Sequence, residues 1–134
     1  MTGLEIEQYT QRLIVENNLL SIGGGCYIGD ERPFNSKQED CNVRLLTGNA
    51  AQVQEGNVIV NIFVPDVMAA DGLWYRNTER CSEVEQMLEA LPAALSRLGD
   101  VRYTHDGMIA TYMENQIRQH FVSAKLKFKL LKGE

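Results

Sequence analysis

The sequence contains few of the residues that build covalent cross-links or metal sites. Its 134 residues include only three cysteines and two histidines. Cys26, Cys41 and Cys81 are odd in number and far apart in the sequence, which argues against a disulfide framework and predicts reduced, mostly buried thiols. The cysteines lack Cys-x-x-Cys spacing, and two histidines are too few for a typical metal cluster unless carboxylates complete it. We therefore expect neither a metal nor another cofactor.

Long apolar runs and catalytic signatures are missing as well. No apolar stretch approaches the roughly 20 residues that a membrane helix needs, and the N-terminus lacks the basic start and apolar run of a secretory signal. No Gly-x-Ser-x-Gly elbow is present, and Gly23-Gly24-Gly25 is not followed by the Lys-Ser or Lys-Thr of a phosphate-binding loop. These absences predict a cytoplasmic protein that has no membrane partner and is not an enzyme.

What is present is the composition of one globular domain. Hydrophobic residues make up 44% of the chain and charged residues 23%, which predicts a single domain spanning residues 1–134. The formal net charge of −5 makes nucleic acid an unlikely partner for the surface as a whole.

Two stretches have the three- and four-residue spacing of amphipathic helices. Thr2 and Glu5 have capping-box spacing and open the first helix. Asn77 or Thr78 caps the second helix, which must kink or restart at Pro92 because proline cannot continue the hydrogen-bond ladder. The expected apolar faces comprise Leu4, Ile6, Tyr9, Leu13 and Ile14 in the first helix, and Cys81, Val84, Leu88, Leu91, Leu95 and Leu98 in the second.

Strand signals are concentrated between and after these helices. The strongest is residues 57–64, where β-branched residues on both faces predict a central strand covered on both sides. Gln54-Glu55-Gly56 and His105-Asp106-Gly107 are typical of hairpin turns. The polar loop 30–40 is expected to be exposed and mobile, with Glu39 and Asp40 solvated. Further strands are expected at residues 26–28, 41–45, 101–103, 108–112 and 122–130.

The order of these elements predicts an α+β fold. One helix, about three strands, a second helix and about three more strands fit a two-layer domain. We expect a mostly antiparallel mixed β-sheet with the two helices packed on one face. Its core should include Val58, Val60, Ile62, Leu88, Leu126 and Phe128.

Two features are candidates for an interface. Lys125, Lys127 and Lys129 lie on one face of the final strand, with Lys132 beyond them. They either guard an edge strand against unwanted pairing, or meet an acidic surface on another protein copy, or contact nucleic acid. A flat apolar patch beside these lysines would favour assembly, whereas a pocket with a perturbed acid would favour an enzyme.

The second candidate is the pair of adjacent aromatics Trp74 and Tyr75. They occur in the long connection before the second helix, and large aromatics in loops often anchor interfaces. The alternative is that the connection folds these side chains back over the core.

Five further stretches of the chain are considered together: Cys26-Tyr27-Ile28, residues 32–36, residues 39–43, residues 54–66 and residues 121–128. In these stretches the chain resembles tail-terminator, or tail-completion, proteins of bacteriophages and prophages, which cap the tail tube as rings. The resemblance implies a structural assembly subunit without catalytic residues. It also implies self-association into a homo-oligomeric ring, contact with other phage tail or head-completion proteins, and a place in the host cytoplasm or the virion. An adaptor protein of a phage or its host, and a small enzyme or ligand-binding domain, remain alternatives.

Overall fold

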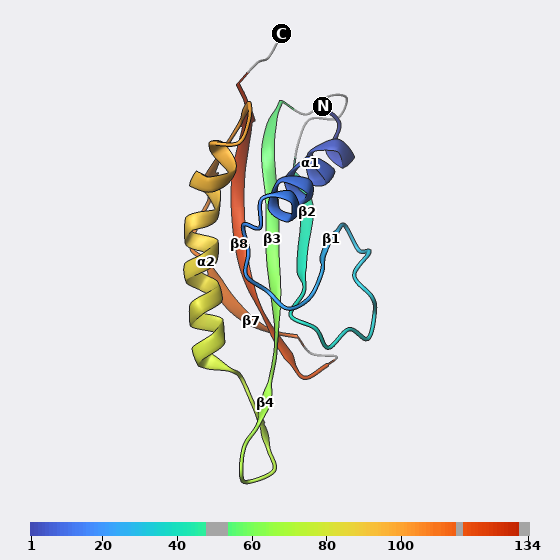
Figure 1. Cartoon of the computed structure of the whole chain (residues 1–134), viewed down its shortest axis with the longest axis vertical. Coiled ribbons are helices and arrows are strands. Elements are labelled where there is room, and N and C mark those ends of the chain that lie inside the picture. The colour runs from blue at the N-terminus through green and yellow to red at the C-terminus, as the bar shows by residue number, and fades with distance from the viewer. Residues whose placement is uncertain (48–53, 115–116, 132–134) are drawn as a thin grey trace.

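Two helices cover one face of a six-stranded sheet (Figure 1). The computed structural model describes residues 1–47, 54–114 and 117–131. The predicted α+β class, the element order and the placement of both helices on one face are confirmed. The helices are α1 (Gly3–Glu16) and α2 (Thr78–Ser96), and the strands are β1 (Cys26–Ile28), β2 (Cys41–Thr47), β3 (Glu55–Pro65), β4 (Val67–Met68), β5 (Trp74–Tyr75), β6 (Val101–His105), β7 (Ala110–Glu114) and β8 (Gln119–Leu130).

The centre of the sheet is the long antiparallel pair of β3 and β8. The strand order is β1-β2-β3-β8-β6, with β7 also paired to β8, and only β1 and β2 run parallel. Pairing of β3 with β8 extends from Glu55–Lys129 to Pro65–Gln119, which confirms the central strand. Glu55 and Gly56, expected in a turn, belong to β3 instead.

The hydrophobic core lies between the sheet and the helices. Every one of the six core residues predicted from the sequence is fully buried. The other face of β3 is only half-buried at Ile59, Asn61 and Phe63, so the expectation that the strand is covered on both sides is wrong. The uncovered face of the sheet therefore remains open to a partner.

Both helices begin where the sequence predicts. Thr2 Oγ1 accepts a hydrogen bond from the Glu5 backbone N–H at 3.2 Å, and the Thr2 backbone N–H donates one to Glu5 Oε1 at 3.0 Å. The α2 helix continues through the buried Pro92 without restarting. Leu4 and Leu98, expected on the apolar faces, are exposed, because Leu4 lies in the first turn of α1 and Leu98 beyond the end of α2.

The predicted hairpin around residues 105–107 is wrong. β6 and β7 pair with β8 one after the other and not with each other. His105 lies opposite Leu126 and Ala110 opposite Ser123, so residues 106–109 oppose only residues 124 and 125. This is a bulge in one interrupted strand. Gly107 has a φ of 96°, so the turn chemistry was identified correctly although the pairing was not.

The loop 30–40 is tied to the domain by a buried carboxylate. Asp40 is 1% exposed and accepts hydrogen bonds from the Gly25 backbone N–H at 2.9 Å, from Arg32 Nε at 2.9 Å and from Ser36 Oγ. Arg32 also donates to Gln119 Oε1 at 3.1 Å. The expectation that Asp40 is solvated is wrong, and the hydrogen bonds of this carboxylate anchor the loop to the domain.

The glycine-rich turn before β1 allows two backbone segments to approach closely. A Cβ atom at Gly24 would lie 2.7 Å from the backbone oxygen of Glu39, whereas one at Gly23 would meet nothing within 4 Å. Gly24 also donates a backbone hydrogen bond to Glu39 at 3.0 Å. Gly24 therefore allows the end of loop 30–40 to pack against the turn before β1.

Candidate functional site

The three candidate lysines lie on the uncovered face of the sheet. Along β8, buried Ala124, Leu126 and Phe128 alternate with exposed Lys125, Lys127 and Lys129. β8 pairs with β3 on one side and with β6 and β7 on the other, so it is a central strand. Protection of a sheet edge is therefore excluded as their role. Lys132 lies outside the described residues.

Neighbouring strands extend this positive charge across the sheet. On β6, Arg102 lies opposite Lys129. On β2, Arg44 lies opposite Ile59 of β3, and Ile59 lies opposite Lys125, so Arg44 is on the same face of the sheet. We call this surface the basic face; its members, all exposed, are Arg44, Arg102, Lys125, Lys127 and Lys129.

Little of the charge on the basic face is neutralised within the chain. Lys125 Nζ lies 3.6 Å from Asp106 Oδ2, and both side chains are more than 40% exposed, so solvent and salt weaken this pair. Within residues 1–47, 54–114 and 117–131, Lys127 and Lys129 form no ion pair. Directly opposite Lys127 on β3 and β6 are the uncharged residues Asn57 and Thr104.

An aromatic cluster continues the uncovered face beyond the basic residues. The ring centroids of Phe63 and Phe121 are 5.6 Å apart, and those of Phe121 and Tyr112 are 5.5 Å apart. The guanidinium of Arg32 lies 3.9 Å from the centroid of the Phe63 ring. Tyr112 is 52% exposed. The aromatic cluster therefore extends across β3, β8 and β7 on the sheet face that carries the lysines.

Trp74 and Tyr75 lie on a projecting two-stranded ribbon. β4 and β5 pair with each other beyond the end of β3, and their connection extends away from the domain (Figure 1). Sequence reasoning missed these strands, because two residues are too few to show an alternation. Trp74 is 38% and Tyr75 47% exposed, so the connection does not fold its aromatics back over the core.

The ribbon is held by polar contacts and exposes apolar side chains. Tyr75 Oη donates a hydrogen bond to Asp71 at 2.6 Å, which raises the pKa of Tyr75 and lowers that of Asp71. The exposed large side chains are Val67, Met68, Leu73, Trp74 and Tyr75. Two-stranded ribbons are marginal alone, and clustered exposed apolar side chains mark interaction sites.

The structure does not bring the two predicted candidates together. The ribbon leaves the sheet where Pro65 pairs with Gln119, and Trp74 stacks near Arg118 with 5.0 Å between the guanidinium and the ring centroid. Lys125 lies about 20 Å farther along β8 at the usual strand rise. The basic face and the ribbon are thus separate surfaces.

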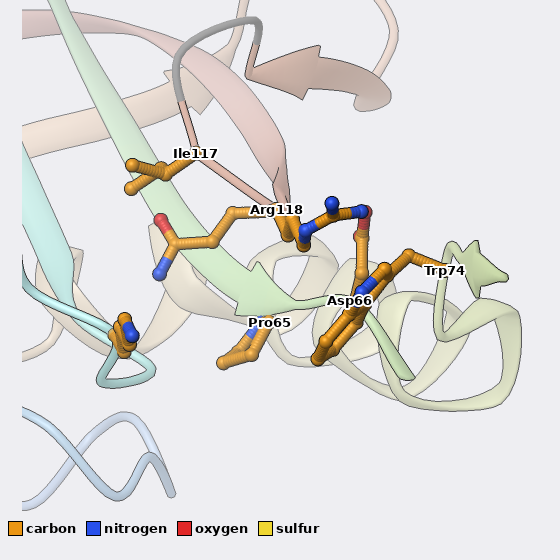
Figure 2. A pocket seen from close by; sticks show the side chains of 7 residues that line it. Pro65, Asp66, Trp74, Ile117 and Arg118 are labelled. Atoms are coloured by element: carbon orange, nitrogen blue, oxygen red, sulfur yellow. The ribbon is translucent and has the colours of Figure 1, made fainter. Parts of the chain in front are cut away.

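A cavity of about 490 Å³ opens at the base of the ribbon (Figure 2). Figure 2 shows the side chain of Arg118 directed toward Trp74 and Asp66, with Ile117 on the opposite side. When His120 carries a proton on Nδ1, this N–H donates a hydrogen bond to Asp66 Oδ1 at 2.7 Å. This cavity could not be predicted from sequence patterns, because its lining comes from four separated segments. The lining residues are Lys37, Pro65, Asp66, Trp74, Ile117, Arg118 and Gln119.

The chemistry of this cavity suits an anion with an apolar body. Lys37 and Arg118 form no ion pair within the described part of the chain. Both ends of the Gln119 amide are already used, by Arg32 and by the Ser36 carbonyl. The positive charges of Lys37 and Arg118 therefore remain for an anion, while Arg118 also lies over the Trp74 ring and Asp66 adds one negative charge to the lining.

The cysteines are free, and two of them are neighbours. Cys41 and Cys81 are buried, whereas Cys26 is half-buried. Cys26 lies opposite Cys41 across β1 and β2. A hydrogen bond from the Cys41 thiol lowers the pKa of Cys26, and this bond and burial raise the pKa of Cys41.

The described residues contain no group of three or more His, Cys, Asp or Glu side chains placed to hold a metal ion. Neither described helix is long and apolar enough to span a membrane. The chain matches no protein-family model and no curated protein.

Proposed function

We propose that this chain is a structural subunit that assembles with further copies of itself. The observation that carries the proposal is the uncovered face of the sheet. Helices pack on one side only, and the other side presents the basic face beside the aromatic cluster of Phe63, Phe121 and Tyr112. An open sheet face that combines unneutralised charge with apolar rings is suited to a protein partner.

The ribbon supports the same proposal. Its exposed apolar side chains extend beyond the domain, where a neighbouring subunit can cover them (Figure 1). Trp and Tyr contribute large contact areas at interfaces. Burial of the ribbon would also stabilise two strands that are marginal alone.

We further propose, from the resemblance to tail-terminator proteins, that the assembly is a ring at the end of a phage tail. Its other partners would then be tail or head-completion proteins. The subunit would function in the host cytoplasm during assembly and in the finished virion.

The solution mass, measured by light scattering or sedimentation at several protein concentrations, tests self-association. We expect a discrete oligomer whose population rises with concentration. Trp74→Ala should weaken the oligomer, and Phe34→Ala, which removes a 79% exposed ring from loop 30–40, serves as the matched control. A monomer at every concentration would overturn the proposal.

The cavity at the base of the ribbon favours ligand binding as a second candidate function. Trp74 is the only tryptophan, so its fluorescence reports directly on the cavity. Titration with phenylacetate, an aromatic carboxylate, should change the emission in the wild type and much less in Arg118→Gln. An unchanged emission in the wild type would exclude this class of ligand.

A further inference from the structure

We propose that the basic face of one copy docks on the outer surface of α2 in a second copy. The proposal rests on the proposed assembly function and names the two surfaces that meet. It is carried by the opposite charges of α2 and β8 and by their places on opposite sides of the domain.

The α2 helix is strongly acidic. It contains four glutamates and one arginine, a net charge of −3. β8 contains three lysines and no acidic residue, a net charge of +3 with His120 neutral. The chain as a whole has a net charge of −5, so the positive charge on β8 is a local feature.

Three glutamates of α2 face solvent. Glu79, Glu83 and Glu89 are exposed, while the apolar side of the helix faces the sheet. Arg80, the one cation of α2, is held mainly by Glu39, with a Nη2–Oε1 distance of 2.6 Å. Glu83 shares Arg80 at 3.0 Å, and within the described residues neither Glu79 nor Glu89 has an ion-pair partner. The outer surface of α2 therefore presents negative charge that Arg80 offsets only in part.

The two charged surfaces point in opposite directions. α2 packs on the helix side of β6 and β8, whereas the lysines leave β8 on the other side. The basic face of one copy can therefore not reach α2 of the same copy. Contact between the two surfaces is therefore heterologous, or head-to-tail, and such contacts form a ring when the rotation between successive copies closes and an open filament when it does not.

The spacing of the charges also matches. The span from Lys125 to Lys129 is about 13 Å at the rise of a strand. The span from Glu79 to Glu89 is about 15 Å at the rise of a helix. The two charged surfaces thus have similar lengths when the helix lies along the strand, with Glu79 and Glu83 on one side of α2 and Glu89 about 120° around it from Glu83.

A second copy explains the basic face better than nucleic acid does. Asp106 lies 3.6 Å from Lys125, and Glu55 lies opposite Lys129 on the same face. A carboxylate repels a phosphate and a glutamate alike, so these residues do not separate the two partners, and what favours a second copy is the acidic surface that α2 of this chain supplies.

Two charge-reversed proteins test the pairing. The sheet variant combines Lys125→Glu, Lys127→Glu and Lys129→Glu, and the helix variant combines Glu79→Lys, Glu83→Lys and Glu89→Lys. Each variant alone presents like charges at the contact, so each should be at least tenfold weaker in self-association than the wild type. An equimolar mixture should restore the oligomer with the two variants in equal amounts.

The control and the fold check use the same measurement of mass. Glu16→Lys combined with Glu31→Lys reverses charge in the same sense as the helix variant at exposed positions elsewhere, and should leave the oligomer intact. Circular dichroism confirms the fold of each variant. Glutamine at positions 79, 83 and 89 replaces lysine if the reversed helix does not fold, and should weaken association less strongly.

Each outcome decides between the partners. A monomeric wild type refutes the proposed function itself, whereas a wild-type oligomer that both variants retain refutes only this docking. Binding of a DNA duplex by the wild type, lost in the sheet variant while its oligomer persists, would assign the basic face to nucleic acid and overturn the proposal. Restoration of the oligomer in the mixture supports it.

Discussion

Removal of the Asp40 carboxylate should destabilise the domain more than any exposed charge change. In Asp40→Ala the guanidinium of Arg32, whose side chain is 11% exposed, loses its only ion-pair partner among the described residues, and the Gly25 N–H loses its acceptor. Breaking a buried ion pair costs about 3–5 kcal/mol because an uncompensated charge remains. Arg32 keeps hydrogen bonds to Gln119 and two backbone carbonyls, so we expect about 3 kcal/mol, the lower end of that range.

Urea unfolding followed by circular dichroism measures this cost. Asp30→Ala, an exposed carboxylate in the same loop, is the matched control and should change the free energy of unfolding by less than about 0.5 kcal/mol. Arg32→Ala combined with Asp40→Ala should cost less than the sum of the two single changes, because the second removal leaves no unpaired charge. A loss below about 1 kcal/mol in Asp40→Ala would refute the reasoning, since the carboxylate would then be hydrated in solution.

Three further outcomes follow from the packing. Ile62→Ala should cost about 2–5 kcal/mol in urea unfolding, because the side chain is fully buried in the central strand; a loss below about 1 kcal/mol would contradict this placement. Gly24→Ala should cost about 1–3 kcal/mol, because its methyl group meets a carboxylate and a backbone carbonyl, whereas Gly23→Ala should be nearly neutral. Iodoacetamide should alkylate native Cys26 faster than Cys41, because Cys26 is more exposed and has the lowered pKa. Mass spectrometry of the digested protein measures the two rates, and equal rates would contradict this prediction.

Features that depend on neighbouring residues in the sequence were predicted well. The capping box of Thr2 and Glu5, the apolar periodicity of α2 and the alternation of residues 57–64 are local patterns with direct physical causes. The same holds for the alternation of Lys125, Lys127 and Lys129 with buried residues. These patterns were enough to predict the α+β class and the exposed side of β8.

Features that depend on pairing between distant segments were not predicted. The sequence Asp106-Gly107 suits a bulge as well as a hairpin turn, and the pairing of β6 and β7 with β8 determines which of the two forms. An exposed lysine row looks alike on an edge strand and on the open face of a central strand. Asp40 is buried because Gly25 and Arg32 reach it from elsewhere in the chain. The cavity beside Trp74 could not be predicted for the same reason.

The central pairing of β3 with β8 has a consequence for how the domain is made. β3 is complete at residue 65, but its partner occupies residues 119–130 and is synthesised much later. Until β8 leaves the ribosome, one edge of β3 has no strand to bind, and Val58, Val60 and Ile62 lack the β8 residues that lie opposite them. Contacts between such distant segments form slowly, and unpaired apolar strands aggregate. The nascent chain is therefore most vulnerable between β3 and β8, and a chaperone that binds extended apolar segments would act on it in that interval.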